Sequence, residues 1–418
     1  MSAEEIFTRF ASRVLFLKCD LSAEEAGLAS GVLVSEDGIV VTNAHVVEGC
    51  RHVIATYISG TSRQSFEAAL KYYDKRTDTA VLKLPKGGWD HFDLGPWVEY
   101  QQVPIGARVY AIGNPRGLEQ TISEGIISGN RKEDGVSWIQ HSAPISPGSS
   151  GGALIGSRGE LLGINSFLLT NSQNLNFAVP SSTLARAVSA ARSLTADAQY
   201  KLGLRYLTGD SVAQDYTAAA VWFRAAAAQG HPEAQTTLGG MYDLGQGVPQ
   251  AYAEAAEWYR KAAEEGYARA QSYLGSLYEA GRGVPQDYAQ AAEWYRKAAE
   301  EGFDLAQNNL GNLYEQGHGV PQDYAQATRW FRKAAENGDA TAQVNLGVCY
   351  MNGEGVPQSY RESFFWIKVA SMGKVGNEKP EDIQALAKSI GAHLTQSDLV
   401  QAEERVREWL ASHPTGAQ

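Results

Sequence analysis

The sequence has little cysteine and no metal-binding pattern. Its three cysteines are Cys19, Cys50 and Cys349, and their spacing matches no known set of metal ligands. We therefore expect no metal and no cofactor. The cysteines are expected to be reduced and buried as small core residues, with a Cys19–Cys50 bridge as the alternative.

A basic surplus and a long apolar run are also missing. The net charge is −11, so no excess of Lys and Arg is available to neutralise phosphates, which argues against nucleic acid as a partner. The N-terminus lacks the basic region of a signal peptide, and the run Val14-Leu-Phe-Leu17 is too short to span a membrane. We expect a cytoplasmic protein without a membrane span, with an export signal upstream of the written start as the alternative.

Two sequence rhythms divide the chain. Up to about residue 193, short β-branched runs alternate with turn residues, which is typical of an all-β sandwich or barrel. Asp37-Gly38 predicts a two-residue hairpin turn, and Ser181 or Ser182 is expected to cap a helix that closes this domain. The predicted domains are residues 1–193, a helical array over 194–373, and a helical cap over 374–418. Strands are expected at Arg108–Ile112, Gly125–Ser128, Ser137–Gln140, Leu161–Phe167 and Asn176–Val179.

The second rhythm is a 36-residue period that occurs five times, marked by Gly203, Gly239, Gly275, Gly311 and Gly347. Each copy predicts two helices around a Gly-x-Gly-Val-Pro-Gln turn. One helix pair cannot bury its apolar face alone, so the pairs must stack into an all-α solenoid. The motifs Leu-Gly-x-x-Tyr and Trp-Tyr-x-x-Ala-Ala resemble those of the Sel-one-like repeat family. The first copy departs from the pattern at residues 210–213, as expected for a terminal repeat beside another domain.

The remaining motifs predict a catalytic triad. Ser150 lies in Pro147-Gly-Ser-Ser-Gly-Gly152, His45 in Val41-Thr-Asn-Ala-His45, and Asp78 directly before a predicted strand. In this hypothesis Ser150 is the nucleophile, His45 the general base and acid, and Asp78 the carboxylate that orients the imidazole. Backbone N–H groups of Gly148 and Ser150 would form the oxyanion hole. The chain order His, Asp, Ser favours a chymotrypsin-type double β-barrel.

Three alternatives compete with this assignment. Gly148-Ser-Ser-Gly-Gly152 also fits the nucleophile elbow of α/β-hydrolases, but those enzymes place Asp and His after the serine. Asp74 is the rival of Asp78, and it lies farther from the strand that follows. His141 is the rival of His45, and we expect its side chain to face outward from a strand.

Several segments together resemble the HtrA family of trypsin-like serine proteases. They are Ser30–Val47, Asp74–Lys83, Ala111–Gly117, Pro147–Gly152 and Asn176–Ser181. The resemblance implies a two-barrel serine endopeptidase that acts on protein or peptide substrates, and it carries His45, Asp78 and Ser150 over as the triad. Ser149 departs from the usual Asn before the nucleophile.

Substrate selection is expected to depend on Ile145, Ile164, Asn165, Ser166 and Ala178. None of these is acidic, which favours small or medium aliphatic side chains over Lys or Arg. The solenoid is expected to bind a protein partner or recruit substrate. The alternative function is a repeat-based scaffold with an inactive protease-like domain.

Overall fold

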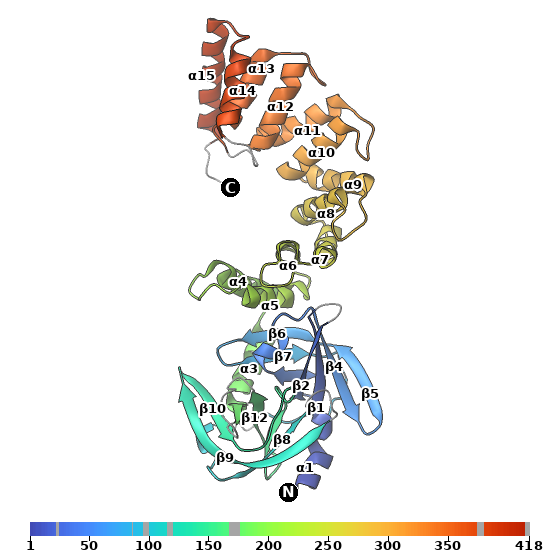
Figure 1. The fold of residues 1–418 in the computed structure, drawn as a ribbon, viewed down its shortest axis with the longest axis vertical. Helices are drawn as coiled ribbons and strands as arrows, with labels where there is room; N and C mark the ends of the chain where they lie inside the picture. The colour runs from blue at the N-terminus through green and yellow to red at the C-terminus, as the bar shows by residue number, and fades with distance from the viewer. Residues whose placement is uncertain are drawn as a thin grey trace. The chain divides into compact units, whose positions relative to one another are not determined.

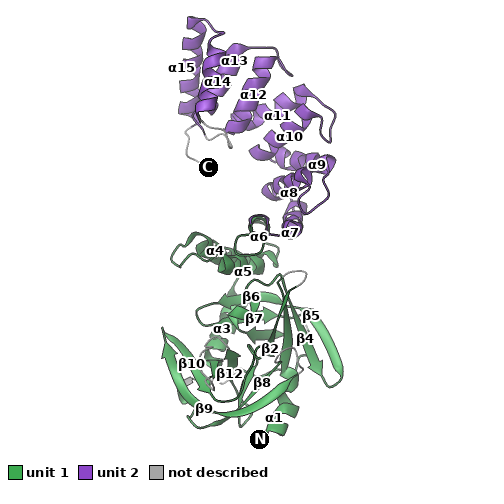
Figure 2. Ribbon diagram, viewed as in Figure 1, with its two compact units in different colours: residues 1–241, 245–249 green, residues 242–244, 250–418 purple. Residues whose placement is uncertain are grey.

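The computed structural model describes residues 1–21, 25–85, 87–94, 100–114, 120–166, 176–373 and 380–413. It divides into two compact units (Figure 2). The first unit contains residues 1–241 and 245–249, and the second contains residues 242–244 and 250–418. The division falls within the predicted solenoid, and the domain boundaries proposed from the sequence remain predictions.

The first unit contains two β-sheets (Figure 1). The first sheet has seven strands in the order β5-β4-β1-β2-β3-β7-β6, and the second is a closed barrel in the order β10-β13-β12-β11-β8-β9. The predicted all-β double-barrel fold is therefore confirmed as two barrel-like sheets, of which the second is closed. The strands of the first sheet are β1 Val14–Asp20, β2 Ala26–Leu33, β3 Ile39–Thr42, β4 His52–Ser59, β5 Ser62–Glu67, β6 Ala69–Asp74 and β7 Thr79–Lys83. Those of the barrel are β8 Arg108–Gly113, β9 Thr121–Glu133, β10 Val136–His141, β11 Ala153–Gly156, β12 Leu161–Ser166 and β13 Asn176–Pro180.

Short helices accompany the sheets. They are α1 Ala3–Phe10, η1 Ala11–Arg13, α2 Ala44–Val47, η2 Tyr100–Gln102 and α3 Ser181–Ser193. The α3 helix ends at Ser193, the last residue of the predicted first domain, but Pro180 is its N-cap residue and no side chain caps it. The predicted cap by Ser181 or Ser182 was wrong, because both serines are already helical and buried. Phe167, predicted to end a strand, lies outside the described residues.

The hairpin between β2 and β3 was predicted correctly, but its two-residue turn was not. Val32 pairs with Val41 and Leu33 with Val40. The connecting turn runs from Ser35 to Gly38, and the N–H of Gly38 donates to the carbonyl of Ser35 at 3.1 Å. Gly38 has φ +87°, so the Asp-Gly pair supplies a left-handed residue within a longer turn.

A disulfide joins Cys19 of β1 to Cys50, which follows α2. The expectation of reduced cysteines is therefore wrong for this pair. The two cysteines are far apart in the sequence, yet β1 pairs with β4 next to Cys50 and brings their Cα atoms to 5.2 Å. Cys349, in contrast, is free and buried, as expected.

Removal of this disulfide should destabilise the first unit. The bond closes a loop with a sequence separation of 31 residues. Loop-closure entropy for such a separation corresponds to about 3–4 kcal/mol of stability. We expect the Cys19→Ala/Cys50→Ala variant to unfold at a lower urea concentration than the oxidised wild type. Wild-type protein in reductant should behave like the variant, and equal midpoints for all three samples would contradict this prediction.

Helices make up the rest of the chain. They are α4 Ala196–Thr208, α5 Tyr216–Ala227, α6 Pro232–Leu244, α7 Tyr252–Glu264, α8 Ala268–Ala280, α9 Tyr288–Glu300, α10 Asp304–Gln316, α11 Tyr324–Glu336, α12 Ala340–Asn352, α13 Tyr360–Ala370, α14 Pro380–Gly391 and α15 Gln396–Ser412. This run of helices confirms the predicted all-α solenoid, and a capping role for α14 and α15 stays a prediction. No helix in the described residues is long and apolar enough to cross a membrane.

Two kinds of glycine allow successive helices to pack closely. A Cβ on Gly275 of α8 would stand 2.8 Å from the Tyr295 ring of α9, so the first helix needs glycine there. Gly283, in the turn after α8, has φ +70°, and its Cβ would stand 2.2 Å from the backbone of Tyr252 in the preceding pair. Ser211, two periods upstream in the first copy, adopts the same left-handed conformation with φ +62°.

Candidate active site

Ser150 lies in a tight turn immediately before β11. Its turn is fixed by hydrogen bonds from the N–H groups of Ser149 and Gly152 to the carbonyls of Ser146 and Ser149, both 2.9 Å long. Gly148 has φ +95°, a conformation that favours glycine. Neither Gly148 nor Ser150 donates its backbone N–H to another residue in the described part of the chain. Among the described residues, both N–H groups are therefore left without a backbone acceptor.

Ser30 of β2 attaches this turn to the first sheet. Its hydroxyl donates to the carbonyl of Gly148 at 2.8 Å, and its N–H donates to the carbonyl of Ser150 at 2.8 Å. A Cβ on Gly151 would stand 2.1 Å from the Ser30 carbonyl oxygen and 2.2 Å from the Thr42 hydroxyl. Glycine at 151 therefore permits the two sheets to approach at this point.

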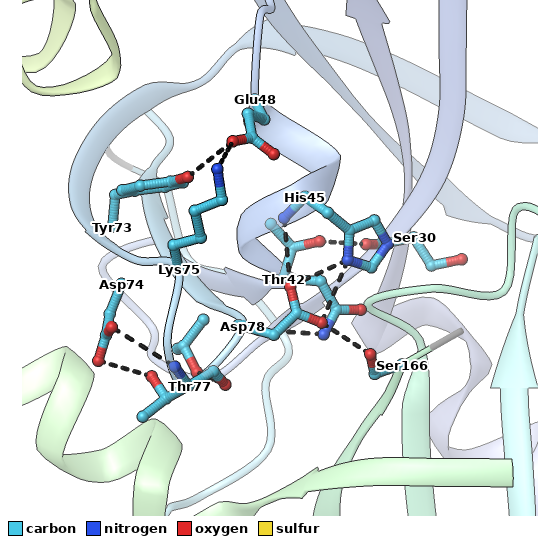
Figure 3. A network of polar contacts seen from close by, with 12 residues as sticks. Ser30, Thr42, His45, Glu48, Tyr73, Asp74, Lys75, Thr77, Asp78 and Ser166 are labelled. Carbon is cyan, nitrogen blue, oxygen red and sulfur yellow. Dashed lines mark hydrogen bonds and ion pairs between the residues drawn. The ribbon is translucent and has the colours of Figure 1, made fainter. Parts of the chain in front are cut away.

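His45 and Asp78 form a hydrogen-bonded pair (Figure 3). The Nδ1 atom of His45 lies 2.9 Å from Oδ1 and 3.1 Å from Oδ2 of Asp78. The backbone N–H of His45 also donates to Asp78 Oδ1, at 3.2 Å. His45 belongs to the short helix α2, and Asp78 precedes β7 in the β6–β7 turn. An ionised carboxylate in this position holds the imidazole with Nδ1 protonated and leaves Nε2 able to accept a proton.

Asp78 is buried in an unusual backbone conformation. Its φ is +46°, a left-handed value that non-glycine residues adopt at some cost, and its exposure is 2%. The Asn43 amide donates to its carbonyl at 3.1 Å, and its own N–H donates to the carbonyl of Lys75 at 3.3 Å. The surrounding bonds compensate for this backbone cost and hold the carboxylate under His45.

Ser166, at the end of β12, is a partner of Asp78 that the sequence did not indicate. Its hydroxyl donates to Asp78 Oδ2 at 2.7 Å and is buried (Figure 3). It thus links the closed barrel to the carboxylate of the first sheet. The sequence placed Ser166 in the specificity pocket, and no local pattern distinguishes the two roles. Within the described residues, no hydrogen bond joins the Ser150 hydroxyl to His45.

The two rivals of the proposed triad have other surroundings. The Asp74 carboxylate accepts from the N–H of Arg76 at 3.0 Å and from the Thr77 hydroxyl at 2.8 Å, so it caps its own turn. His141 is fully buried at the end of β10, which corrects the expectation that it faces outward. Neither of its ring nitrogens has a hydrogen-bond partner in the described part of the chain. Burial lowers the pKa of His141 to about 4.

This buried histidine should make stability depend on pH. The folded-state pKa of His141 is about 4, below the ordinary value of 6.5. Between pH 4 and pH 6.5 this histidine is therefore protonated in the unfolded chain and neutral in the folded chain. Stability therefore falls as the pH drops from 6.5 towards 4, by about 3 kcal/mol at pH 4. We expect His141→Leu to lose less stability than the wild type between pH 7 and pH 4.5, as measured by urea unfolding. Parallel losses in the two proteins would contradict this assignment.

The five residues predicted for substrate selection occupy different places. Ile145 and Asn165 line a cavity of about 140 Å³ together with Ser149, and all of its lining side chains in the described residues are uncharged. Ile164 and Ala178 are fully buried, each in a hydrophobic core of the first unit. Their role in specificity stays a prediction.

Comparison with known proteins assigns a family to the β-sheet domain and to the helical repeats. Residues 29–164 match the family model of the trypsin-like peptidase domain, and the Sel1 repeat model matches 196–231, 232–267, 268–303, 304–339 and 340–374. The chain therefore combines a trypsin-like peptidase domain with Sel1 repeats.

The peptidase domain is homologous to HtrA-type serine endoproteases, as the sequence motifs predicted. The chain is 39% identical over 166 residues to a probable periplasmic serine endoprotease DegP-like of Halomonas elongata, covering 38% of this chain and 34% of that protein. It is 40% identical over 164 residues to the serine endoprotease DegS of Haemophilus influenzae, covering 37% of this chain and 46% of that protein. A solved protective antigen of uropathogenic Escherichia coli with an SLR fold shows 36% identity, a TM-score of 0.43 and coverage of 51% of this chain and 48% of that one.

The chain thus spans less than half of the length of these curated relatives. The DegP-like relative is named as periplasmic. The cytoplasmic location expected from the N-terminal sequence is therefore not supported.

Proposed function

We propose that the protein is a serine endopeptidase whose catalytic triad is His45, Asp78 and Ser150. The observation that carries this proposal is the buried Asp78 carboxylate bonded to His45 Nδ1 at 2.9 Å and to the Ser166 hydroxyl at 2.7 Å. This arrangement stabilises an imidazolium and fixes the tautomer that a general base requires. Ser166 then acts as a positioning residue for the carboxylate.

The reaction follows from these positions. Substrate binding brings the Ser150 hydroxyl within reach of His45 Nε2, which takes the hydroxyl proton as Oγ attacks the scissile carbonyl carbon. The N–H groups of Gly148 and Ser150 bind the resulting oxyanion. His45 gives the proton to the leaving amine, and an acyl-enzyme on Ser150 remains. Water gives a proton to His45 and attacks the ester carbonyl; His45 then returns that proton to Ser150 Oγ as the acid product leaves.

The substrate class follows from the predicted pocket residues. Of these residues, Ile145 and Asn165 line the cavity of about 140 Å³, and no described side chain of its lining is acidic, so none would pair with Lys or Arg. We assign a preference for small or medium aliphatic side chains beside the scissile bond. The Sel1 repeats would bind a protein, either the substrate or a partner that delivers it.

An oxidising compartment, such as the periplasm, is the proposed location. The Cys19–Cys50 disulfide supports this, since such bonds persist outside the reducing cytoplasm. The name of the DegP-like relative supports it as well.

A fluorophosphonate probe and unfolded casein test the proposed function together. The probe reacts with a serine that a neighbouring base activates, so we expect covalent labelling of Ser150 alone, together with casein cleavage. Labelling without cleavage would favour a latent enzyme that awaits a partner. Absence of both would favour the scaffold function, in which the repeats act and the protease domain is inactive.

A further inference from the structure

The first repeat packs against the sheet that carries His45 and Asp78. Trp222 of α5 is 3% exposed and belongs to the same hydrophobic core as Val46, Val47 and Leu82. Its ring lies edge-on to Tyr72 and Tyr73 of β6, with centroid distances of 6.1 and 6.4 Å. An indole buried in this way removes a large apolar area from water. The α5 helix is therefore part of the first sheet's core.

A polar contact fixes the neighbouring helix α4. Gln199 of α4 is fully buried, and its amide donates to the carbonyl of Lys71 in β6 at 2.9 Å. Its side-chain oxygen accepts from the Gln229 amide at 2.6 Å. Both helices of the first repeat thus hold β6, the strand that leads into the turn of Asp78.

Lys75 connects three elements at this turn. Figure 3 shows its contact with Glu48. Its Nζ atom lies 2.9 Å from Glu48 Oε1 and 2.8 Å from Asp215 Oδ2. Glu48 directly follows the α2 helix of His45 and also accepts from the Tyr73 hydroxyl at 3.3 Å. Asp215 is the N-cap of α5, where its side chain accepts from the N–H of Ala218. One ammonium group therefore joins the His45 helix, the Asp78 turn and the first repeat.

The pKa shifts of Lys75 and Asp215 favour the charged form of both groups. Hydrogen bonds to Asp215 and then Glu48 raise the pKa of Lys75. Burial opposes ionisation of Asp215, but hydrogen bonds from Lys75 and from the Ala218 N–H outweigh it, and its pKa is lowered. Lys75 is 53% exposed, so these ion pairs add little to global stability. We expect the two ion pairs to act instead on the position of the catalytic groups.

We propose that Lys75 and Asp215 are positioning residues, through which the first repeat holds His45 and Asp78 in catalytic alignment. This inference rests on the proposed function. Lys75 touches neither member of the pair with its side chain, but its carbonyl accepts the N–H of Asp78 at 3.3 Å. A shift of the Lys75 backbone would therefore move the carboxylate. Small displacements of catalytic groups reduce turnover strongly while substrate binding is retained.

Four full-length variants test the inference by casein cleavage and the rate of fluorophosphonate labelling. Asp215→Asn keeps a residue that caps helices well but removes the charge that faces Lys75. We expect kcat to fall about 3- to 10-fold with KM unchanged, the pattern of a defect in the transition state. Lys75→Met should lower kcat by about 10-fold or more, and Lys75→Arg should restore part of it. Because both changes break one contact, the double variant Lys75→Met/Asp215→Asn should lose little more than Lys75→Met.

Lys201→Met is the matched control. Lys201 pairs with Asp197 at 2.8 Å on the exposed face of the same repeat, and no hydrogen bond or ion pair in the described residues joins it to the triad. Its kcat should equal that of the wild type. Wild-type kcat in Asp215→Asn and Lys75→Met, whether or not the melting temperature falls, would overturn the inference alone. A wild-type protein that neither cleaves casein nor takes the label would instead refute the proposed function, and the inference with it.

Discussion

We expect Ser150→Ala to lower the turnover of unfolded casein about a million-fold, because the substitution removes the atom that forms the acyl-enzyme. Transition-state binding by the N–H groups of Gly148 and Ser150 would remain, so weak residual hydrolysis above the uncatalysed rate is compatible with the mechanism. The measurement is kcat under saturating substrate, with the fluorophosphonate label as a count of active sites. The variant should take no label.

Ser149→Ala is the matched control for this experiment. Ser149 adjoins the nucleophile, has the same 7% exposure and shares its turn, so the substitution tests damage to the turn. Its kcat should stay within a few-fold of the wild type. Equal cleavage by the wild type and Ser150→Ala would show that another residue, or a contaminant, hydrolyses casein.

The second large effect is expected for Asp78→Asn, with a loss of about 10⁴-fold in kcat. The amide can donate to Nδ1 and thereby stabilise the wrong tautomer of His45, in which Nε2 carries the proton and cannot act as a base. Asn also tolerates the left-handed backbone at φ +46°, so the loss would not come from local refolding. The measurement is kcat near neutral pH, together with a thermal unfolding curve.

Asp74→Asn serves as the comparison for Asp78→Asn. Both carboxylates belong to the β6–β7 connection, but Asp74 bonds only within its own turn among the contacts described above. A change of less than about 3-fold is expected there. If the two variants lost activity equally, the orienting carboxylate would not be Asp78.

Local patterns were sufficient for much of the fold. Alternation of β-branched residues with turns located strands β8, β10 and β13 to within a few residues, because these features depend on neighbours in the chain. The period of the repeats located the helices of the solenoid for the same reason. Likewise, the motifs around His45 and Asp78 placed both residues beside strands that the structure brings together.

Features that depend on distant contacts were missed. The burial of His141 is set by its tertiary surroundings, while its own strand offers two possible faces. The Cys19–Cys50 bond depends on the pairing of β1 with β4, which the sequence does not specify. Ser166 and Lys75 likewise act across elements. The sequence shows each only as a polar residue at or directly after the end of a strand. Many residues without such roles share this feature.

The turns of the repeats give the array a direction. Gly247, Gly283, Gly319 and Gly355 each face the backbone of a tyrosine that begins a helix of the preceding copy, and a Cβ would collide there at 2.1 to 2.2 Å. Ser211 holds the equivalent left-handed position with a side chain, because the helices before it belong to no earlier copy. Each inner repeat thus carries a glycine that the backbone of the preceding repeat requires. Duplication of an inner copy would generate a compatible neighbour, whereas a copy inserted ahead of the first would meet a serine where glycine is required. The array can gain length by duplication of its inner copies, while its junction with the protease stays fixed.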